Sequence, residues 1–167
     1  MTTQLWTRRG FSAIGLAALF WRSTARAATE EPDKGISRAA EAIHQEVTFK
    51  AAPARIYKAL LDETQFSQLT GPPAQIGRDA GAAFSLFGGQ IKGRHLELAP
   101  GERVVQAWRS EGWPLHVYSV VRFELSVQGS GTKLVFDHTG FPVGQAEHLA
   151  TGWKEHYWDA LAKLPGA

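Results

Sequence analysis

Residues 145–164 carry apolar side chains at the spacing of an amphipathic helix. At about 100° per residue these side chains fall within an arc of about 120°, and no charged residue falls inside that arc. The members of this stripe are Ala146, Leu149, Ala150, Trp153, Tyr157, Ala160, Leu161 and Leu164. A helix with one apolar face has to bury that face against another layer, so the rest of the chain must supply a partner for it. Trp158 falls off the arc, and we expect it at a sheet edge.

Residues 82–141 are predicted to supply the partner layer as an antiparallel sheet. The clearest alternation lies in residues 117–127, where Val121 and Phe123 share one face and Arg122 and Glu124 share the other. Short turns such as Gly88-Gly89 and Pro100-Gly101 favour a meander over crossover connections. The strand-like runs are 82–87, 91–98, 104–108, 117–127 and 134–139.

The segment before the meander predicts one more strand and two short helices. Residues 43–51 alternate as a half-buried strand does, and Pro53 suits the first turn of a helix. A second helix is expected around 65–69, because Gly71-Pro72-Pro73 would end it. Together these patterns predict an α+β fold: a curved antiparallel sheet that wraps a long C-terminal helix, with two short helices after the first strand.

Composition and motifs exclude several kinds of chemistry. The 167 residues are 44% hydrophobic and 20% charged and include no cysteine, which describes a globular chain without disulfides or thiolate metal sites. The chain has no His-Glu-x-x-His, no Gly-x-Ser-x-Gly and no phosphate-binding glycine loop. We therefore predict no catalytic residues, no metal and no cofactor.

The first 27 residues are predicted to be an export signal. Four arginines and no acidic residue lie there, around an apolar stretch at 11–21, and Ala25-Arg26-Ala27 suits a signal peptidase. Arg8-Arg9 resembles a twin-arginine motif, although Ser12 and Ala13 depart from it and leave the general secretory route open. The apolar stretch is shorter than the roughly 20 residues of a membrane-spanning helix. We expect no stable membrane span after signal removal, and a periplasmic or secreted location.

The remaining chain is predicted to divide into a flexible linker at 28–40 and one domain at 41–167. Without the four leader arginines the chain has 14 basic and 16 acidic residues, and its formal charge falls from +2 to about −2. Its lysines and arginines are scattered singly, so we predict no nucleic-acid partner.

Several short segments resemble one superfamily in their order and spacing. They are Ala52 to Leu60, Phe84 with Gly88-Gly89, Val104 to Arg109, His138-Thr139-Gly140, and Gly152-Trp153 with Tyr157-Trp158. Over about residues 42–164 the chain resembles the SRPBCC (START-like, birch-pollen-allergen-like) superfamily, and most of all the branch similar to the C-terminal domain of the heat-shock-protein-90 ATPase activator. The resemblance implies a helix-grip fold with a cavity between sheet and terminal helix, which often accepts hydrophobic or amphipathic small molecules. It implies no fixed reaction.

We predict nine residues as the lining of that cavity. For each, a role in the scaffold competes with a role in binding: Trp153 and Tyr157 either pack the core or also roof a cavity, and His138 is either a satisfied core histidine or a proton-transferring group. Arg109 is either a solvated strand-end residue or a clamp for a carboxylate. The nine are Phe84, Trp108, Arg109, Val121, Phe123, Phe136, His138, Trp153 and Tyr157.

Three functions remain open from the sequence. The first is an exported binding protein, monomeric or weakly dimeric, that holds a small hydrophobic or amphipathic molecule. The second is a protein-interaction domain like the chaperone-ATPase activator, although an exported domain would meet neither a cytosolic chaperone nor its ATP. The third is a cyclase- or aromatase-like enzyme in which His138, Arg109 and Tyr157 would move protons or stabilise an anion.

Overall fold

The computed structural model describes residues 41–166. The predicted export signal at 1–27 and the predicted linker at 28–40 lie outside the described residues. Both remain predictions.

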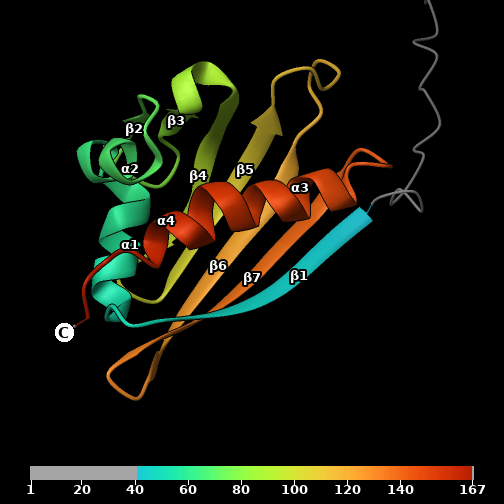
Figure 1. The fold of residues 1–167 in the computed structure, drawn as a ribbon. Coiled ribbons are helices and arrows are strands. Elements are labelled where there is room, and N and C mark those ends of the chain that lie inside the picture. Colours follow the sequence, from blue (N-terminus) through green and yellow to red (C-terminus); the bar gives the residue numbers. More distant parts are fainter. Residues whose placement is uncertain (1–40, 167) are drawn as a thin grey trace, which may run out of the picture. The chain divides into compact units, whose positions relative to one another are not determined.

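The domain contains a seven-stranded antiparallel sheet with the order β1-β7-β6-β5-β4-β3-β2 (Figure 1). The meander expected over 82–141 is confirmed as five strands that pair consecutively, and the first strand returns to pair with the last. The strands are β1 Glu41–Phe49, β2 Gln75–Ile76, β3 Ala83–Leu86, β4 Ile91–Ala99, β5 Arg103–Ser110, β6 Ser119–Gln128 and β7 Gly131–Phe141. Strand β2 was not predicted, because two residues show no periodicity.

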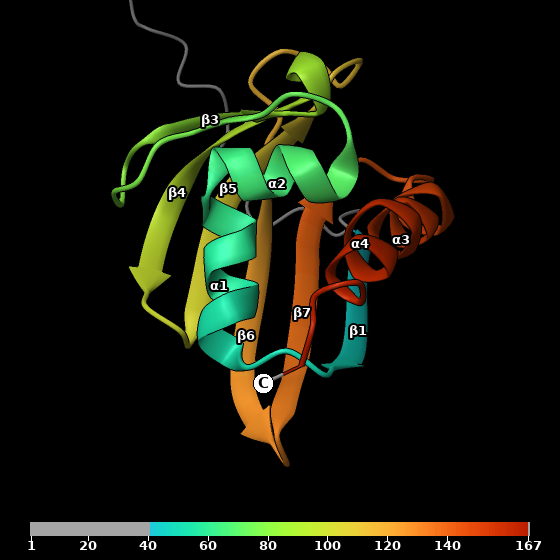
Figure 2. The ribbon, with the colours of Figure 1, turned by 60° about the vertical axis from the view of Figure 1, so that its left-hand side comes forward.

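Two short helices follow β1, as predicted. Helix α1, Pro53–Leu61, begins with proline at its first turn and buries Ile56, Ala59 and Leu60. Helix α2, Glu63–Thr70, begins where the Asp62 carboxylate accepts the backbone N–H of Gln65 at 2.9 Å. It ends at Gly71, whose φ of 95° suits glycine. Both helices cover the same sheet face as the C-terminal helix (Figure 2).

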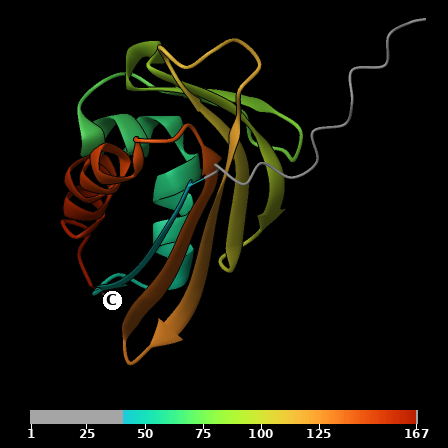
Figure 3. The same cartoon turned by 90° about the vertical axis from the view of Figure 1, so that its right-hand side faces the viewer.

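The C-terminal helix runs from residue 146 to residue 161 and crosses the inner face of the sheet (Figures 1 and 3). It consists of α3 Ala146–Trp153, a π-helical turn η2 Lys154–Trp158, and α4 Asp159–Leu161. In the π turn the Asp159 N–H bonds the Lys154 carbonyl five residues back. This turn holds one residue more than an α-helical turn.

The π turn corrects the expectation for Trp158. A uniform helical period places Trp158 away from the apolar face, but the additional residue brings it onto the inner side, where it is 6% exposed. Its indole donates to Gln45 on the edge strand β1 at 2.7 Å, so the contact with a sheet edge is present as expected. Its ring packs against Phe136 at 5.1 Å.

Aromatic side chains fill the space between the helix and the middle of the sheet. Phe123 and Phe136 are cross-strand partners with ring centroids 5.3 Å apart. The Trp153 ring packs against the rings of Phe136 and Tyr157, with centroid distances of 4.4 Å and 4.3 Å. This part of the predicted cavity is therefore packed core.

A β-bulge in β4 changes which side chains share a face. Strict alternation would put His95 and Glu97 on one face, but the pairing with β5 shifts register at Leu96. His95 is fully buried, whereas Leu96 is 50% exposed and Glu97 forms an exposed ion pair with Arg103. Strict alternation breaks at Leu96, because β4 holds one residue more than β5 at this point.

Candidate functional site

The structure separates the nine predicted site residues into three places. Five line neither of the two concavities described below. Of these, Val121, Phe123 and Phe136 are at most 1% exposed and pack the core, and His138 and Arg109 have partners within the protein. Trp108, Trp153 and Tyr157 line a cleft at one end of the C-terminal helix, and Phe84 lines a basin on the sheet.

His138 is held in a buried hydrogen-bond chain. The Trp153 indole donates to His138 Nδ1 at 3.0 Å, so Nδ1 is the unprotonated nitrogen. His138 Nε2 then carries the proton and donates to Ser119 Oγ at 2.7 Å, and Ser119 donates to the Trp108 carbonyl at 3.0 Å. Burial lowers the pKa of His138 to about 3, which keeps the ring neutral. Both ring nitrogens are occupied, so this histidine has neither a free lone pair nor a free proton for a substrate.

Arg109 fixes the loop between β5 and β6. Its guanidinium donates to the Trp113 carbonyl at 2.6 Å. The Trp113 side chain is buried and packs edge-on against Trp108 at 5.5 Å. Arg109 thus holds an aromatic residue over the end of the core.

A cleft of about 470 Å³ lies where α3 and η2 meet β4, β5 and the segment after α2. Three of the nine predicted residues line it: Trp153 and Tyr157 from the C-terminal helix and Trp108 from β5. No Lys, Arg, Asp or Glu is among its lining residues, which are Thr70, Pro72, Phe87, Gln90, Ile91, Trp108, Ser110, His148, Leu149, Gly152, Trp153, His156 and Tyr157. The cleft is therefore mainly apolar, with polar groups at a few positions.

Two buried polar atoms, on side chains that line this cleft, form no hydrogen bond of normal geometry with the described residues. They are the indole Nε1 of Trp108 and the hydroxyl of Tyr157, on side chains only 4% and 6% exposed. Burial raises the pKa of Tyr157, and a hydrogen-bonding interaction with the Trp108 side chain lowers it by a smaller amount. The phenol is therefore a neutral O–H group. Leaving such groups unsatisfied costs about 1–3 kcal/mol each.

Phe87 forms a wall of the cleft in a strained conformation. Its φ of 53° lies in the left-handed region, which a bulky residue rarely adopts. Packing holds it there, because its ring contacts Phe66 at 5.5 Å and Tyr157 at 5.6 Å. Strained backbone of this kind is concentrated at binding sites. Phe87 was not predicted as a site residue, because the following Gly88-Gly89 indicated only a turn.

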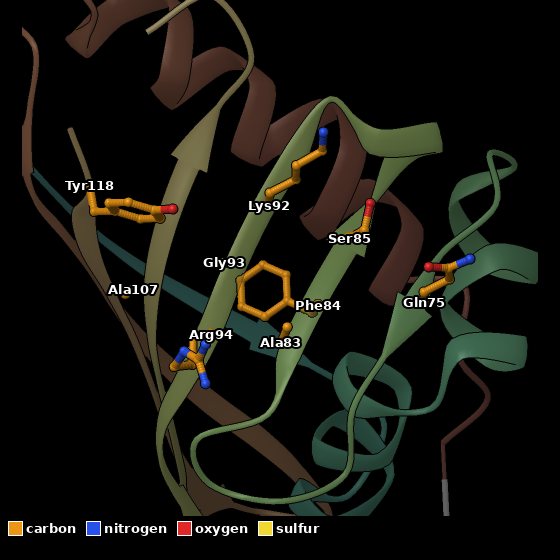
Figure 4. A pocket seen from close by; sticks show the side chains of 9 residues that line it. All are labelled: Gln75, Ala83, Phe84, Ser85, Lys92, Gly93, Arg94, Ala107 and Tyr118. Atoms are coloured by element: carbon orange, nitrogen blue, oxygen red, sulfur yellow. The ribbon is translucent and has the colours of Figure 1, made fainter. Parts of the chain in front are cut away.

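A second concavity of about 620 Å³ lies on the outer face of the sheet (Figure 4). Lys92 and Arg94 extend from β4 on this side, between Ser85 and Tyr118. Neither cation forms an ion pair with a carboxylate of residues 41–166, and Arg94 donates to the Gly81 carbonyl. The floor is apolar, since it consists of Ala83, Phe84, Gly93 and Ala107. We refer to these residues together with Gln75 as the outer basin.

The described part of the chain contains no group of three His, Cys, Asp or Glu residues that could hold a metal ion. Within residues 41–166, no helix is long and apolar enough to cross a membrane.

Comparison with known proteins identifies the family. Residues 50–166 match the family described as "Activator of Hsp90 ATPase homolog 1-like protein" (AHSA1). The chain belongs to the AHSA1 family. The resemblance expected from the sequence is thereby confirmed, together with the helix-grip-like α+β fold.

The AHSA1 relatives include curated proteins and solved structures. The activator of 90 kDa heat shock protein ATPase homolog of Dictyostelium discoideum is 31% identical over 114 residues, which cover 68% of this chain and 30% of that protein. This chain thus spans about a third of the length of the curated relatives that it matches. The crystal structure of an HSP90 activator from Plasmodium falciparum has a TM-score of 0.65 and 27% identity, covering 72% of this chain and 91% of that one.

A further AHSA1-type structure shares the fold alone. The solution structure of the Aha1 dimer from Colwellia psychrerythraea has a TM-score of 0.62 at 20% identity, and the match covers 74% of this chain and 99% of that one.

Proposed function

We propose that this AHSA1 domain acts by binding a partner protein, and that the partner is a chaperone ATPase of the class named by its relatives. The observation that carries the proposal is the family match over residues 50–166. The packing of the core supports it, since Phe123, Phe136 and Trp153 fill the middle of the sheet–helix interior. Because the middle of the interior is filled, the surface of the domain offers more room for a partner than the interior does.

The outer basin is the docking surface in this proposal. Lys92 and Arg94 project from an otherwise apolar floor without a carboxylate partner among the described residues. Such a surface complements an acidic patch on the partner, because opposite potentials steer association and fix orientation. Tyr118, 53% exposed at the rim, supplies an aromatic contact of the kind enriched at interfaces.

A purified chaperone of the heat-shock-protein-90 class tests the proposal. We expect the chain to raise ATP turnover, and the double variant Lys92→Glu/Arg94→Glu to lose at least tenfold in apparent affinity. The exposed Lys163 provides the matched control, since Lys163→Glu reverses a charge away from the basin. Unchanged turnover with the wild-type chain would refute the activator role. Equal affinity of the double variant and the control would refute the basin as the docking surface.

A second candidate function is the binding of a small apolar molecule in the cleft. The specific observation in its favour is the cleft of about 470 Å³ itself, whose lining includes four aromatic side chains and no Lys, Arg, Asp or Glu. Gly152 allows a direct test, because a Cβ built there meets no atom within 4 Å. Gly152→Leu would fill the cleft. Gly152→Ala raises the helix propensity at this position to a similar extent but leaves most of the cleft open.

We propose further that residues 1–27 direct export, and the compartment separates the two candidates. Export would separate the domain from cytosolic ATP, which favours small-molecule binding in the cleft as the function. A cytosolic location would favour binding to the chaperone ATPase. Mass spectrometry of fractionated bacteria should find a chain that begins at Ala28. Arg8→Lys/Arg9→Lys should retain the precursor if the route is the twin-arginine one and leave export intact if it is the general secretory one. An intact Met1 on soluble cytosolic material would contradict export.

A further inference from the structure

We infer that this chain forms a symmetric homodimer in which strand β1 of one copy pairs antiparallel with strand β1 of a second copy. Strand β1 is one edge of the seven-stranded sheet (Figure 1), and among the described strands it pairs only with β7. Pairing of two β1 strands would join the two sheets into one continuous sheet. The dimer is independent of both candidate functions, since no residue of β1 lines the cleft or the outer basin.

The two edges of the sheet differ in their protection against a further strand. An edge strand offers a row of unpaired N–H and C=O groups, and proteins usually block that row with prolines, bulges or very short strands. Strand β2 is blocked in this way, because it has only two residues and follows Pro72-Pro73. Strand β1 has nine residues without proline or glycine, and its pairing with β7 is regular from Ala42 onward. No backbone–backbone hydrogen bond joins residues 41–49 to a described residue outside β7, so this long edge is open to another strand.

The sequence of β1 complements itself in one antiparallel register. Pairing centred on Gln45, the middle residue, aligns all nine residues of the two strands. On the inner face it places Ile43 of one copy opposite Val47 of the other, and on the outer face it places His44 opposite Glu46. The two-fold axis repeats each of these pairs. A centre one residue away shortens the overlap and places Glu46 opposite Glu46, or His44 opposite His44.

The charged groups beside the edge extend this complementarity across the junction. His44 Nδ1 lies 2.7 Å from Asp137 Oδ1, and Lys133 Nζ lies 3.0 Å from Glu46 Oε2. A protonated imidazole donates from both ring nitrogens, so His44 can bind Asp137 of its own chain and Glu46 of the second copy. Cations and anions then alternate across the junction in the order Lys133 and Glu46 of one copy, His44 and Asp137 of the other. Opposite charges at directly paired positions stabilise a pair of strands, whereas like charges destabilise it.

Strand β1 is fixed in position before a second copy binds. The Gln45 side chain accepts the indole N–H of Trp158 at 2.7 Å. The Glu41 carboxylate accepts the backbone N–H groups of Gly144 and Ala146 at 2.9 Å and 3.1 Å. Association therefore does not have to order the strand, which reduces its entropic cost.

Charge variants of the full chain test the pairing through its oligomeric state. In sedimentation velocity the wild-type chain should shift from one chain to two as its concentration rises. We expect His44→Glu and Glu46→Lys each to weaken the dimer by about fivefold or more, because each removes two attractive pairs and introduces repulsion. The double variant His44→Glu/Glu46→Lys should restore the dimer, since it exchanges the two charges.

Glu102→Lys is the matched control for charge reversal. Glu102 is exposed in the turn between β4 and β5, away from the sheet edge that β1 forms. The control variant should dimerise like the wild-type chain. Thermal unfolding of every variant checks that each is folded, and restoration by the double variant separates a lost contact from a damaged fold.

The absence of cysteine from the chain permits a direct test of the register. In the proposed register His44 lies opposite Glu46 of the second copy, at a Cα separation of about 4.5–5.5 Å that suits a disulfide. Mixing the variants His44→Cys and Glu46→Cys under oxidising conditions should therefore give a cross-linked dimer of the two chains. Mixing His44→Cys with Thr48→Cys is the control, because these positions are about 7 Å out of register and should cross-link poorly.

Each contrary result overturns a definite part of the inference. A chain that stays monomeric up to millimolar concentration does not form this dimer. If a monomeric chain shows slow amide hydrogen exchange along the outer edge of β1, another segment of the same chain occupies that edge. A dimer that the charge variants leave unchanged uses a different surface. Preferential cross-linking of the control pair would refute the register centred on Gln45.

Discussion

Two glycines show how differently the same residue is used in this fold. Gly93 on β4 lies so close to its neighbours that a Cβ would approach the Ala107 carbonyl to 2.1 Å and the Phe84 ring to 2.3 Å. A Cβ built at Gly152 in α3 meets no atom within 4 Å. The first glycine is required by close approach of the strands, and the second lies beside open space.

The two glycines predict substitutions of opposite sign. Gly93→Ala should destabilise the domain by about 1–3 kcal/mol, because the methyl group forces neighbouring backbone apart. Gly152→Ala should stabilise it by about 1 kcal/mol through helix propensity. Urea unfolding monitored by circular dichroism would measure both. A loss of stability for Gly152→Ala would show that the position is crowded.

His138 predicts how stability depends on pH. Its pKa is about 3 in the folded domain against 6.5 as the ordinary value, and burial lowers the pKa of His95 as well. Below pH 6.5 the unfolded chain takes up a proton that folded His138 refuses until about pH 3. Stability should therefore fall as the pH drops through this window, by up to about 1.4 kcal/mol per pH unit for this group.

The variant His138→Gln identifies that contribution. Glutamine can accept from Trp153 and donate to Ser119, yet it does not titrate. We expect a shallower loss of stability between pH 6.5 and pH 4 in urea titrations of this variant than in those of the wild-type domain. An unaltered slope in His138→Gln would assign the acid sensitivity to other groups.

Among the elements, the π turn of the C-terminal helix has the clearest structural consequence. The turn Lys154–Trp158 holds one residue more than an α turn and brings Tyr157 and Trp158 onto the buried side together. Removing one residue from a π turn restores the α-helical ladder while the segments before and after keep their faces. Removing one residue from an α-helical turn rotates everything that follows by about 100°.

Deletions of single exposed residues test this element. We expect deletion of Glu155, inside the π turn, to leave a cooperatively folded domain. Deletion of Thr151 in α3 should turn Trp153 and Tyr157 out of the core and cost at least about 3 kcal/mol. Thermal unfolding followed by near-ultraviolet circular dichroism distinguishes the two. Equal damage by both deletions would refute the account of the π turn.

At the scale of the whole domain, the sheet and the C-terminal helix depend on each other. The inner face of β6 and β7 presents Phe123 and Phe136 to Trp153 and Trp158 of the helix. A single helix of this kind has little stability alone, and one sheet with an exposed aromatic face has no core. The interior therefore forms only when both layers are present.

Truncation after Phe141 should therefore abolish cooperative unfolding. The truncated chain would expose its sheet face, bind hydrophobic dyes and aggregate. Removal of residues 165–167 alone should change stability by less than about 0.5 kcal/mol. Calorimetry measures both, and a cooperative transition in the chain that ends at Phe141 would show that the sheet folds without its cover.

Much of the fold could be predicted because the relevant signals are local. The alternation around Phe123, the proline at the start of α1 and the apolar stripe through Trp153 each reflect neighbours within a few residues. Less of the candidate site could be predicted: Trp108, Trp153 and Tyr157 line the cleft, whereas Phe87 and His156 were not anticipated. Their place in the cleft depends on a turn and a helix that are distant in sequence.

The sequence by itself determined which segments become strands and helices and which faces they bury, because side-chain periodicity and turn chemistry act over short distances. Only the tertiary structure decided the π turn, the bulge at Leu96 and the proton position on His138. It also brought Trp108 and Tyr157 together beside a cleft. These features depend on how separate segments pack against one another, and no local pattern encodes the geometry of that packing.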